Sequence, residues 1–343
     1  MKNRREFLKT AALGASGLAL APSWLQGAPA IIKSFNDSKT QIEGVTIGCI
    51  TYSFRQMKDQ SAEAILNYVT TAGVSAVELM GDPAEDFIGK PKIYFNRMDL
   101  FVLIGKERNE TITDQEKKEL EEMRASVDSY NQDVAKWREG ADISKLAELK
   151  AMYNNAGVDI YAFKPSTFGK LNNDAEMDYG MRAAKALGAS HVTLEHPSDD
   201  AHTMKLGKLA EEHGITIGYH GHEQQTFTFW DTALEQSPSN ALNLDVGHYV
   251  AAGHTDLMDL ITKQSSRISS MHIKDRQTPE NGKGNLPWGE GDTPIVEILA
   301  MMRDNSYSFP ATIELEYKVP SGSNPVLEVQ KCFEFCANAL TQA

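Results

Sequence analysis

Short apolar runs and amphipathic stretches alternate along most of the chain. The runs are rich in Val, Ile and Leu, as buried strands are, and most of the stretches between them repeat apolar residues at helical spacing. Eight strand and helix pairs can be counted. Because parallel strands need helical crossovers and eight of them close a ring, this order predicts an α/β fold, the (β/α)8 TIM barrel. The expected strands cover residues 45–51, 76–80, 159–163, 191–195, 216–222, 242–245, 269–274 and 311–316.

The expected helices are bounded by ordinary capping signals, such as Ser61 before the first helix and Gly214 after the fourth. A glycine-rich stretch, residues 281–292, is expected to be a loop. The helices cover residues 61–71, 143–156, 171–187, 201–213, 256–263, 294–303 and 325–339, with a short one beginning near Asp231.

Residues 82–140 interrupt this order and are expected to form a helical insertion after the second strand. Thr113 and Glu116 make a capping box, which predicts the start of a long charged helix. Apolar residues follow at spacings of three and four and form a seam: Leu120, Met123, Val127, Tyr130, Val134 and Trp137. The seam is expected to pack on the insertion's own barrel, to cover the barrel mouth, or to join two copies in a homo-oligomer.

Residues 1–30 have the pattern of an export signal. Arg4 and Arg5 precede an apolar stretch, and Ala28-Pro-Ala30 offers a small-x-small cleavage site. We therefore expect a mature barrel domain over residues 31–343, exported folded by the twin-arginine route to the periplasm. The stretch is too short for a membrane span, so none is expected.

Composition fits one large domain and argues against several partners. The chain has 343 residues, of which 41% are hydrophobic. Without residues 1–30 it keeps 30 basic and 46 acidic residues, a net charge of −16. Such an acidic surface repels phosphate backbones, so no nucleic-acid partner is expected. The three cysteines lack zinc-type spacing, and we expect buried free thiols.

Chemistry is concentrated at the ends of the last predicted strands. In a parallel barrel all such ends meet at one mouth, and the second strand adds Glu78 there. Side chains alternate along a strand, so residues two apart share a face. The pairs that share a face are His220 with His222, His272 with Lys274, and Glu314 with Glu316.

These ends predict a metal site. An imidazole from the fifth strand, Asp245 from the sixth, His272 from the seventh and Glu314 from the eighth would form a shell of nitrogen and oxygen ligands. It carries two negative charges, which suits one divalent Zn, Mn, Co or Ni ion. The shell is too rich in nitrogen for calcium.

At these motifs the chain resembles the xylose isomerase-like barrels, a superfamily of sugar isomerases and epimerases, inosose dehydratases and endonuclease IV type nucleases. The resemblance covers residues 42–340 outside the insertion. It rests on four segments with Gly289-Glu-Gly-Asp292 between the last two: Tyr219-His-Gly-His222, Leu244-Asp-Val-Gly-His248, His272-Ile-Lys-Asp275 and Glu314-Leu-Glu316.

The resemblance implies a metal shell of Glu, Asp, His and Glu on the last four strands. Asp245, His272 and Glu314 match it, and His220 stands where the first Glu is usual. That Glu often doubles as the catalytic base, so Glu195 at the end of the fourth strand is a candidate for a fifth ligand or for the base. The remaining candidates for proton transfer or substrate binding are His222, His248, Lys274 and Glu316.

The resemblance also implies the chemistry. A metal that grips a carbonyl and its neighbouring hydroxyl acidifies the adjacent C–H, so a side chain can remove that proton. The outcome is epimerisation, isomerisation, or β-elimination by a lyase or dehydratase. Because sugar phosphates are cytoplasmic, an exported member is expected to act on an unphosphorylated sugar or glycoside, such as a 3-keto glycoside. A non-catalytic periplasmic sugar-binding protein is the alternative class; the acidic charge and the export signal argue against a nuclease.

Overall fold

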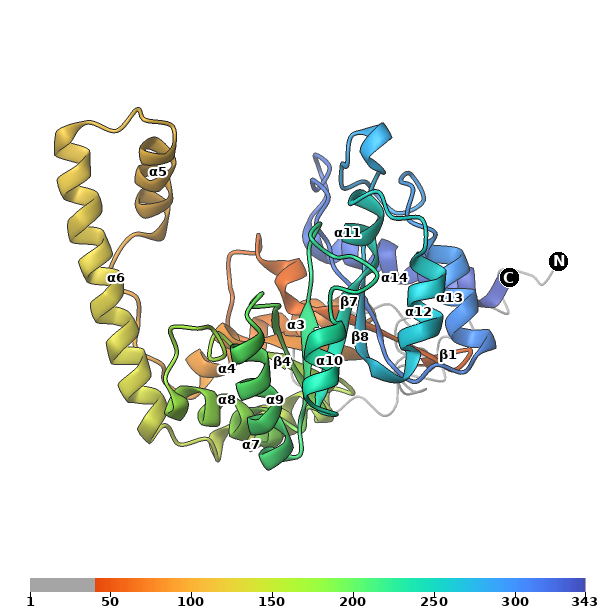
Figure 1. Cartoon of the computed structure of the whole chain (residues 1–343), viewed down its shortest axis with the longest axis horizontal. Helices are drawn as coiled ribbons and strands as arrows, with labels where there is room; N and C mark the ends of the chain where they lie inside the picture. Colours follow the sequence, from red (N-terminus) through yellow and green to blue (C-terminus); the bar gives the residue numbers. More distant parts are fainter. Residues whose placement is uncertain (1–40, 343) are drawn as a thin grey trace, which may run out of the picture.

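Eight parallel strands close into a barrel in the computed structural model, which describes residues 41–342 (Figure 1). Each strand pairs with the next in sequence, and β9 returns to pair with β2, so the predicted (β/α)8 barrel is confirmed. The short strand β1, Gln41–Ile42, pairs antiparallel with β2 outside the ring. The barrel strands are β2 Val45–Ile50, β3 Ala76–Met80, β4 Asp159–Lys164, β5 His191–Glu195, β6 Thr216–His220, β7 Asn240–Asp245, β8 Ile268–Ile273 and β9 Ala311–Ile313.

Helices surround the barrel and cover the outer face of its strands. Their apolar faces meet the strands in one continuous core, in which residues such as Leu66, Leu79 and Ile298 are fully buried. The surrounding helices are α3 Ala62–Thr71, α7 Lys145–Asn155, α8 Asp174–Leu187, α9 Asp200–His213, α10 Asp231–Gln236, α11 Val246–Ala251, α12 Leu257–Gln264, α13 Ile295–Asp304 and α14 Pro325–Gln342, with 3-10 turns η3 Thr51–Phe54, η4 Ser265–Arg267 and η5 Pro279–Asn281.

Several boundaries differ from the sequence prediction, and three of the differences matter here. Helix α8 begins at Asp174 rather than at residue 171, because Asn173 and Glu176 form a capping box there. Strand β6 stops at His220, so His222 lies in the following loop. Strand β9 stops at Ile313, and the segment that carries Glu314 and Glu316 follows it.

The segment after β9 is held by Ser53 and Arg55, which lie just after β2. The Ser53 hydroxyl donates to the Ile313 carbonyl at 3.4 Å and accepts from the Leu315 N–H at 3.0 Å. Arg55 donates to the Leu315 carbonyl at 2.8 Å. Side chains thus replace strand pairing here and fix the backbone between the two glutamates.

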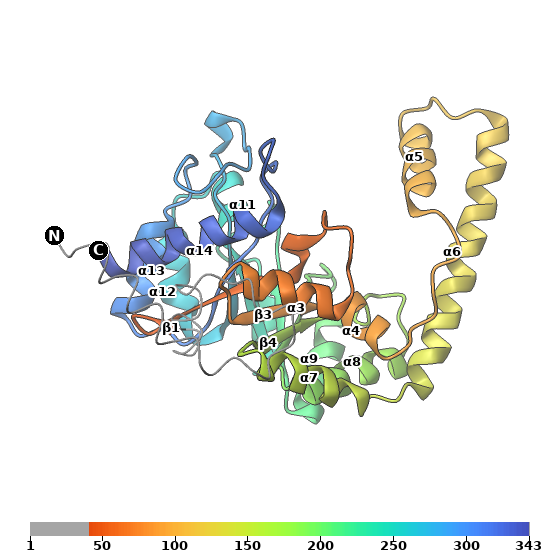
Figure 2. The same ribbon diagram turned by 180° about the vertical axis from the view of Figure 1, so that it is seen from behind.

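The insertion contains three helices rather than one. They are α4 Gly81–Phe87, α5 Arg97–Arg108 and α6 Asp114–Gly140, and the predicted capping box of Thr113 and Glu116 does open α6. Helix α5 was not predicted, because its apolar residues face several directions and give no single periodic stripe. Figures 1 and 2 show α5 and α6 side by side in a hairpin, here called the arm, that stands away from the barrel.

The seam of α6 divides between two partners. Near the barrel, the Trp137 ring packs edge-on against Tyr179 of α8, with 5.9 Å between ring centroids. Farther along, Tyr130 contacts the rings of Tyr94 and Phe95 in the segment that leads into α5. The seam therefore packs on the barrel at one end, which is one of the three arrangements expected from the sequence. At its other end the seam packs within the arm.

Arg138 ties the arm to the barrel. Its guanidinium donates to Glu85 of α4 at 2.9 Å and to Glu176 of α8 at 2.8 Å. All three side chains are buried. A buried guanidinium between two carboxylates satisfies charges that would be costly alone, so the position of the arm depends on this contact.

Three further sequence expectations concern the cysteines, membrane spans and the export signal. The three cysteines are buried and free, as expected, and burial raises the pKa of Cys49 to about 12. Within residues 41–342 no helix is both long and apolar enough to cross a bilayer. The predicted export signal, residues 1–30, lies outside the described residues.

We predict that Arg138→Ala destabilises the fold, because it leaves the buried Glu176 without a cation and Glu85 with Lys90 alone, 3.5 Å away. Breaking such a buried pair costs about 3–5 kcal/mol, measured as the free energy of unfolding in urea. Arg124 lies on α6, as Arg138 does, and forms an exposed pair with Glu107 of α5. Arg124→Ala removes this pair and is the control, which should cost less than about 1 kcal/mol. Equal losses in the two variants would contradict the anchoring role.

Candidate metal and catalytic site

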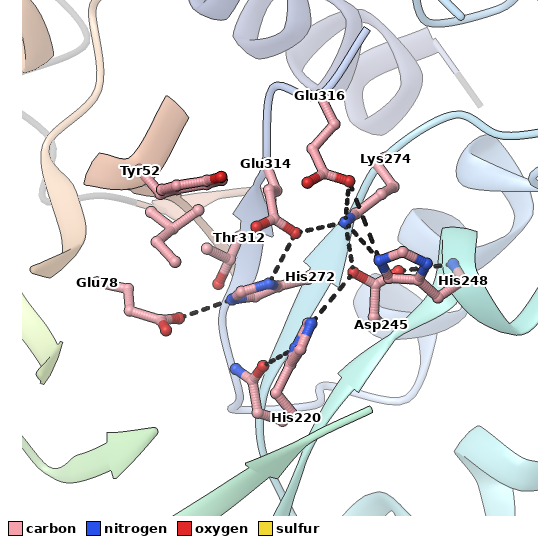
Figure 3. A network of polar contacts seen from close by, with 12 residues as sticks. Tyr52, Glu78, His220, Asp245, His248, His272, Lys274, Thr312, Glu314 and Glu316 are labelled. Atoms are coloured by element: carbon pink, nitrogen blue, oxygen red, sulfur yellow. Dashed lines mark hydrogen bonds and ion pairs between the residues drawn. The ribbon is translucent and has the colours of Figure 1, made fainter. Parts of the chain in front are cut away.

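Four buried side chains converge at the mouth of the barrel (Figure 3). They come from the ends of β6, β7 and β8 and from the residue after β9. Each offers one ligand atom, and these atoms all lie within 4.8 Å of one another. The structure thus brings together the four residues predicted to bind the metal: His220, Asp245, His272 and Glu314.

The interior of the barrel orients His220. Its Nδ1 lies 2.7 Å from Asn243 Oδ1, and the Asn243 amide nitrogen donates to Ser270 Oγ at 2.7 Å. Ser270 in turn lies 3.0 Å from His191 Nε2. Since the Asn243 oxygen can only accept, His220 Nδ1 carries the hydrogen and Nε2 keeps its lone pair. Burial lowers the pKa of His220 to about 3, so the ring is neutral and can coordinate a metal.

Two carboxylates hold His272 from opposite sides. Its Nε2 lies 2.8 Å from Glu78, and its Nδ1 lies 3.1 Å from Glu314. Burial favours the neutral ring, but the two negative charges outweigh it and raise the pKa of His272 to about 10. Glu78 is fully buried and also accepts from Thr193. It therefore orients a candidate ligand from behind, the usual arrangement at metal-bound histidines.

Asp245 divides its two oxygens between structure and site. Oδ1 accepts from the His248 N–H at 2.7 Å and so caps α11. Oδ2 is buried, accepts no hydrogen bond of acceptable geometry and lies 2.9 Å from the Lys274 ammonium. Burial alone would raise the pKa of this carboxyl, yet Lys274 keeps it lowered. A charged, incompletely satisfied oxygen facing two imidazoles suits a divalent metal.

Lys274 lies at the centre of the negative charge. Its Nζ is 2.9 Å from Asp245, 2.6 Å from Glu314 and 2.7 Å from Glu316. Burial favours the neutral amine, but the three carboxylates raise its pKa above the usual value. As expected from strand alternation, Lys274 and His272 face the same interior. Glu316 is thus paired with Lys274 in this structure.

His248 lies beside this cluster on α11. Arg276 donates to its Nδ1 at 2.6 Å, so in the neutral ring the hydrogen is on Nε2. Nε2 lies 3.2 Å from Lys274 Nζ and 4.0 Å from Glu316. The ring stacks on His222, with 4.5 Å between centroids. His248 Nε2–H thus faces the mouth.

Glu195 stands apart from the four-residue cluster. At the end of β5 it accepts from His222 Nε2 and from Lys164 Nζ, both at 2.9 Å. Burial raises its pKa, but these two partners outweigh burial and keep the carboxyl ionised. About half of the side chains of Glu195 and His222 is exposed, so the pair can reach a ligand in the mouth.

A family model described as the xylose isomerase-like TIM barrel matches residues 130–336. The chain belongs to this family. An inosose dehydratase from Clostridium perfringens is 29% identical over 143 residues, 36% of this chain and 47% of that protein. The chain thus spans about half the length of the curated relatives it matches.

Solved structures share the fold. An L-ribulose 3-epimerase matches with a TM-score of 0.54 and 13% identity over 86% of this chain and 94% of that one. A 3-keto-D-glucoside 4-epimerase from E. coli matches with a TM-score of 0.54 and 10% identity over 85% of this chain and 98% of that one. At such identities the likeness shows the fold alone.

Sequence reasoning about this xylose isomerase-like barrel missed several residues at the site. Lys164 was missed because the third predicted strand ended one residue early, at residue 163. Asn243 lies between Leu242 and Leu244 in β7, and a polar residue between two apolar ones was the available signal. Arg276 follows the His272 segment in a loop and gave no periodic signal.

We predict that the two glutamates after β9 differ in role. Glu314→Gln should weaken zinc binding by more than the roughly 10–100-fold that is typical when a group that only orients a ligand is changed, because an amide oxygen replaces an anionic ligand. Glu316→Gln should keep zinc affinity within about tenfold of the parent and lower turnover by roughly 10²–10⁴-fold. Competition with a chromophoric chelator measures the affinity. The reverse pattern would place the ligand two residues later.

Proposed function

We propose that this protein is a divalent-metal-dependent sugar isomerase or epimerase, which removes a proton next to a carbonyl of an unphosphorylated sugar or glycoside. The convergence of His220, Asp245, His272 and Glu314 on one buried point carries the proposal. Charged groups that can move protons surround that point. The named relatives are enzymes of this general chemistry, and 3-keto sugars are the substrate class to test first.

The metal would be one Zn, Mn, Co or Ni ion held by these four residues. When bound, it would supply Lewis-acid stabilisation to a carbonyl and an adjacent hydroxyl of the sugar. The site's own residues are prepared for it, since Asn243 leaves His220 Nε2 free and Glu78 fixes His272. Lys274 supplies the countercharge that the carboxylates otherwise require.

Two carboxylates are placed to move the proton. Glu195 ends β5 and Glu316 follows β9, and these strands are four apart in a ring of eight, on opposite sides of the barrel. A planar sugar intermediate between them would present one face to each carboxylate. Removal of the proton by one and return by a group on the opposite side inverts the carbon, which favours epimerisation. His222 and Lys164 hold Glu195 in its ionised, proton-accepting form.

A dehydratase or other lyase is the second candidate. The detectable sequence relatives include inosose dehydratases, and His248 and Lys274 lie next to Glu316, where either could donate a proton to a departing oxygen. β-Elimination needs this acid as well as the base. Preference for an unphosphorylated substrate rests on the predicted export signal, and a non-catalytic sugar-binding protein is the remaining class.

We predict that the metal-loaded protein exchanges a carbon-bound hydrogen of a 3-keto glucoside with deuterated water, detected by NMR and mass spectrometry. EDTA should abolish exchange, and Glu195→Gln should lower it by roughly 10²–10⁴-fold. Glu297→Gln, an exposed change on α13, is the control and should have no effect. Epimers or released aglycone in the products distinguish the two reactions. Absence of exchange with 3-keto and ordinary sugars after metal reconstitution would contradict the enzyme and favour the non-catalytic sugar-binding protein.

We also propose that two copies associate through the arm. Of the large hydrophobic side chains exposed among the described residues, more than half lie between residues 93 and 104: Ile93, Tyr94, Met98, Phe101, Val102 and Ile104. The other exposed ones are scattered singly. Within residues 41–342, the apolar surface that matches the arm is therefore the same arm of another copy, as in a two-fold interface.

This interface predicts that Phe101→Asp produces monomers where the parent chain forms dimers, measured by light scattering across a range of concentrations. Phe101 is 64% exposed, so the change should leave the fold intact. Leu171→Asp, which changes a still more exposed apolar residue outside the arm, is the control and should stay dimeric. A monomeric parent chain would overturn the interface.

A further inference from the structure

A cleft separates the base of the arm from the loop after β2. Its volume is about 560 Å³. One wall is η3 and the residues after it, and the other is α4 with residues 90–97 that lead into the arm. The arm itself contributes Arg97 and Tyr130 to the lining.

The cleft adjoins the candidate metal site. Thr51 and Met80, at the tips of β2 and β3, line its floor, and the Thr51 hydroxyl accepts from the Met80 N–H at 3.0 Å. Tyr52 lines the same cleft, and its neighbour Ser53 is hydrogen-bonded to Ile313 and Leu315, the residues on either side of Glu314. A ligand seated at the barrel mouth can therefore extend past Tyr52 toward the arm.

The cleft is positive in a chain whose net charge is −13. Four basic side chains and two acidic ones line it. Lys90 lies 2.5 Å from Asp82 and 3.4 Å from Asp86 and so offsets much of the acidic charge. The remaining basic residues are Arg55, Lys92 and Arg97.

These three basic side chains have hydrogen-bond donors that remain available to a ligand. Among the described residues, Lys92 has no ion pair or hydrogen bond, and the nearest carboxylate oxygen to Arg97 is 3.9 Å away, on Asp82. The Arg55 guanidinium covers one face of the Tyr52 ring, 4.4 Å from its centroid. Tyr52 is 40% exposed, and its hydroxyl has no partner among the same residues.

We propose that this cleft is a subsite for an anionic group, a carboxylate or a sulfate, on the sugar unit next to the reacting one. Guanidinium and ammonium donors recognise both anions, and guanidinium pairs with carboxylate through two parallel hydrogen bonds. The aromatic ring and hydroxyl of Tyr52 are available to the sugar that carries the anion. This inference rests on the proposed function for the place of the reacting sugar.

Calorimetry on the full-length protein tests the subsite without requiring turnover. The probes are cellobiouronic acid, cellobiose 6′-sulfate and cellobiose, which differ in the anion. At least one acidic probe should bind about tenfold or more tighter than cellobiose, with a difference that shrinks at high salt. A preference for one of the two acidic probes identifies the anion.

The double variant Lys92→Gln/Arg97→Gln should lose this preference and bind all three probes like cellobiose. Both side chains are exposed, so the fold should survive. Lys117→Gln, which removes an exposed charge on α6 outside the cleft, is the control and should keep the preference. Equal affinity for the three probes in the parent protein, or a preference that survives the double change, would overturn the subsite. Deuterium exchange on keto sugars can fail or succeed independently of this result.

Discussion

Negative charge buried in the barrel mouth is the constraint on which the rest of the site depends. Glu78, Asp245 and Glu314 are all buried, and isolated carboxylates at such positions would take up protons rather than stay ionised. The pKa values of all three are nevertheless lowered, because His272 and Lys274 lie among them. The arrangement therefore requires positive charge. A divalent metal would supply that charge without relying on the protons that His272 and Lys274 carry.

The charge also explains the dense packing of polar groups behind the site. An imidazole wedged between two carboxylates has a fixed direction, and so does one held by an amide. The strands supply this order because their side chains enter the barrel in layers and cannot move apart. His222, by contrast, lies in the loop after β6 and is half exposed, so it can reach a ligand in the mouth.

The sequence predicted the barrel well because its evidence is periodic and local. Apolar runs that end in His220, Asp245 and His272 identify strands and their tips together. Helix α5 was missed because it stands away from the barrel and its apolar residues do not form a single face. Lys164, Asn243 and Arg276 were missed for a different reason: their importance comes from neighbours on other strands, which no spacing along one chain reveals.

The polar column behind His220 has a consequence for the whole barrel. Asn243, Ser270 and His191 continue it inward, and His191 Nδ1 lies 2.9 Å from the hydroxyl of Ser190, which is exposed just before β5 begins. Each member has both a donor and an acceptor role, so the direction of one hydrogen bond sets the direction of the next. The two ends of the barrel therefore share one hydrogen-bond polarity, and the Asn243 amide fixes its direction. A reversal would require this amide to turn over and exchange its oxygen and nitrogen, and it would then present a protonated His220 nitrogen to the mouth.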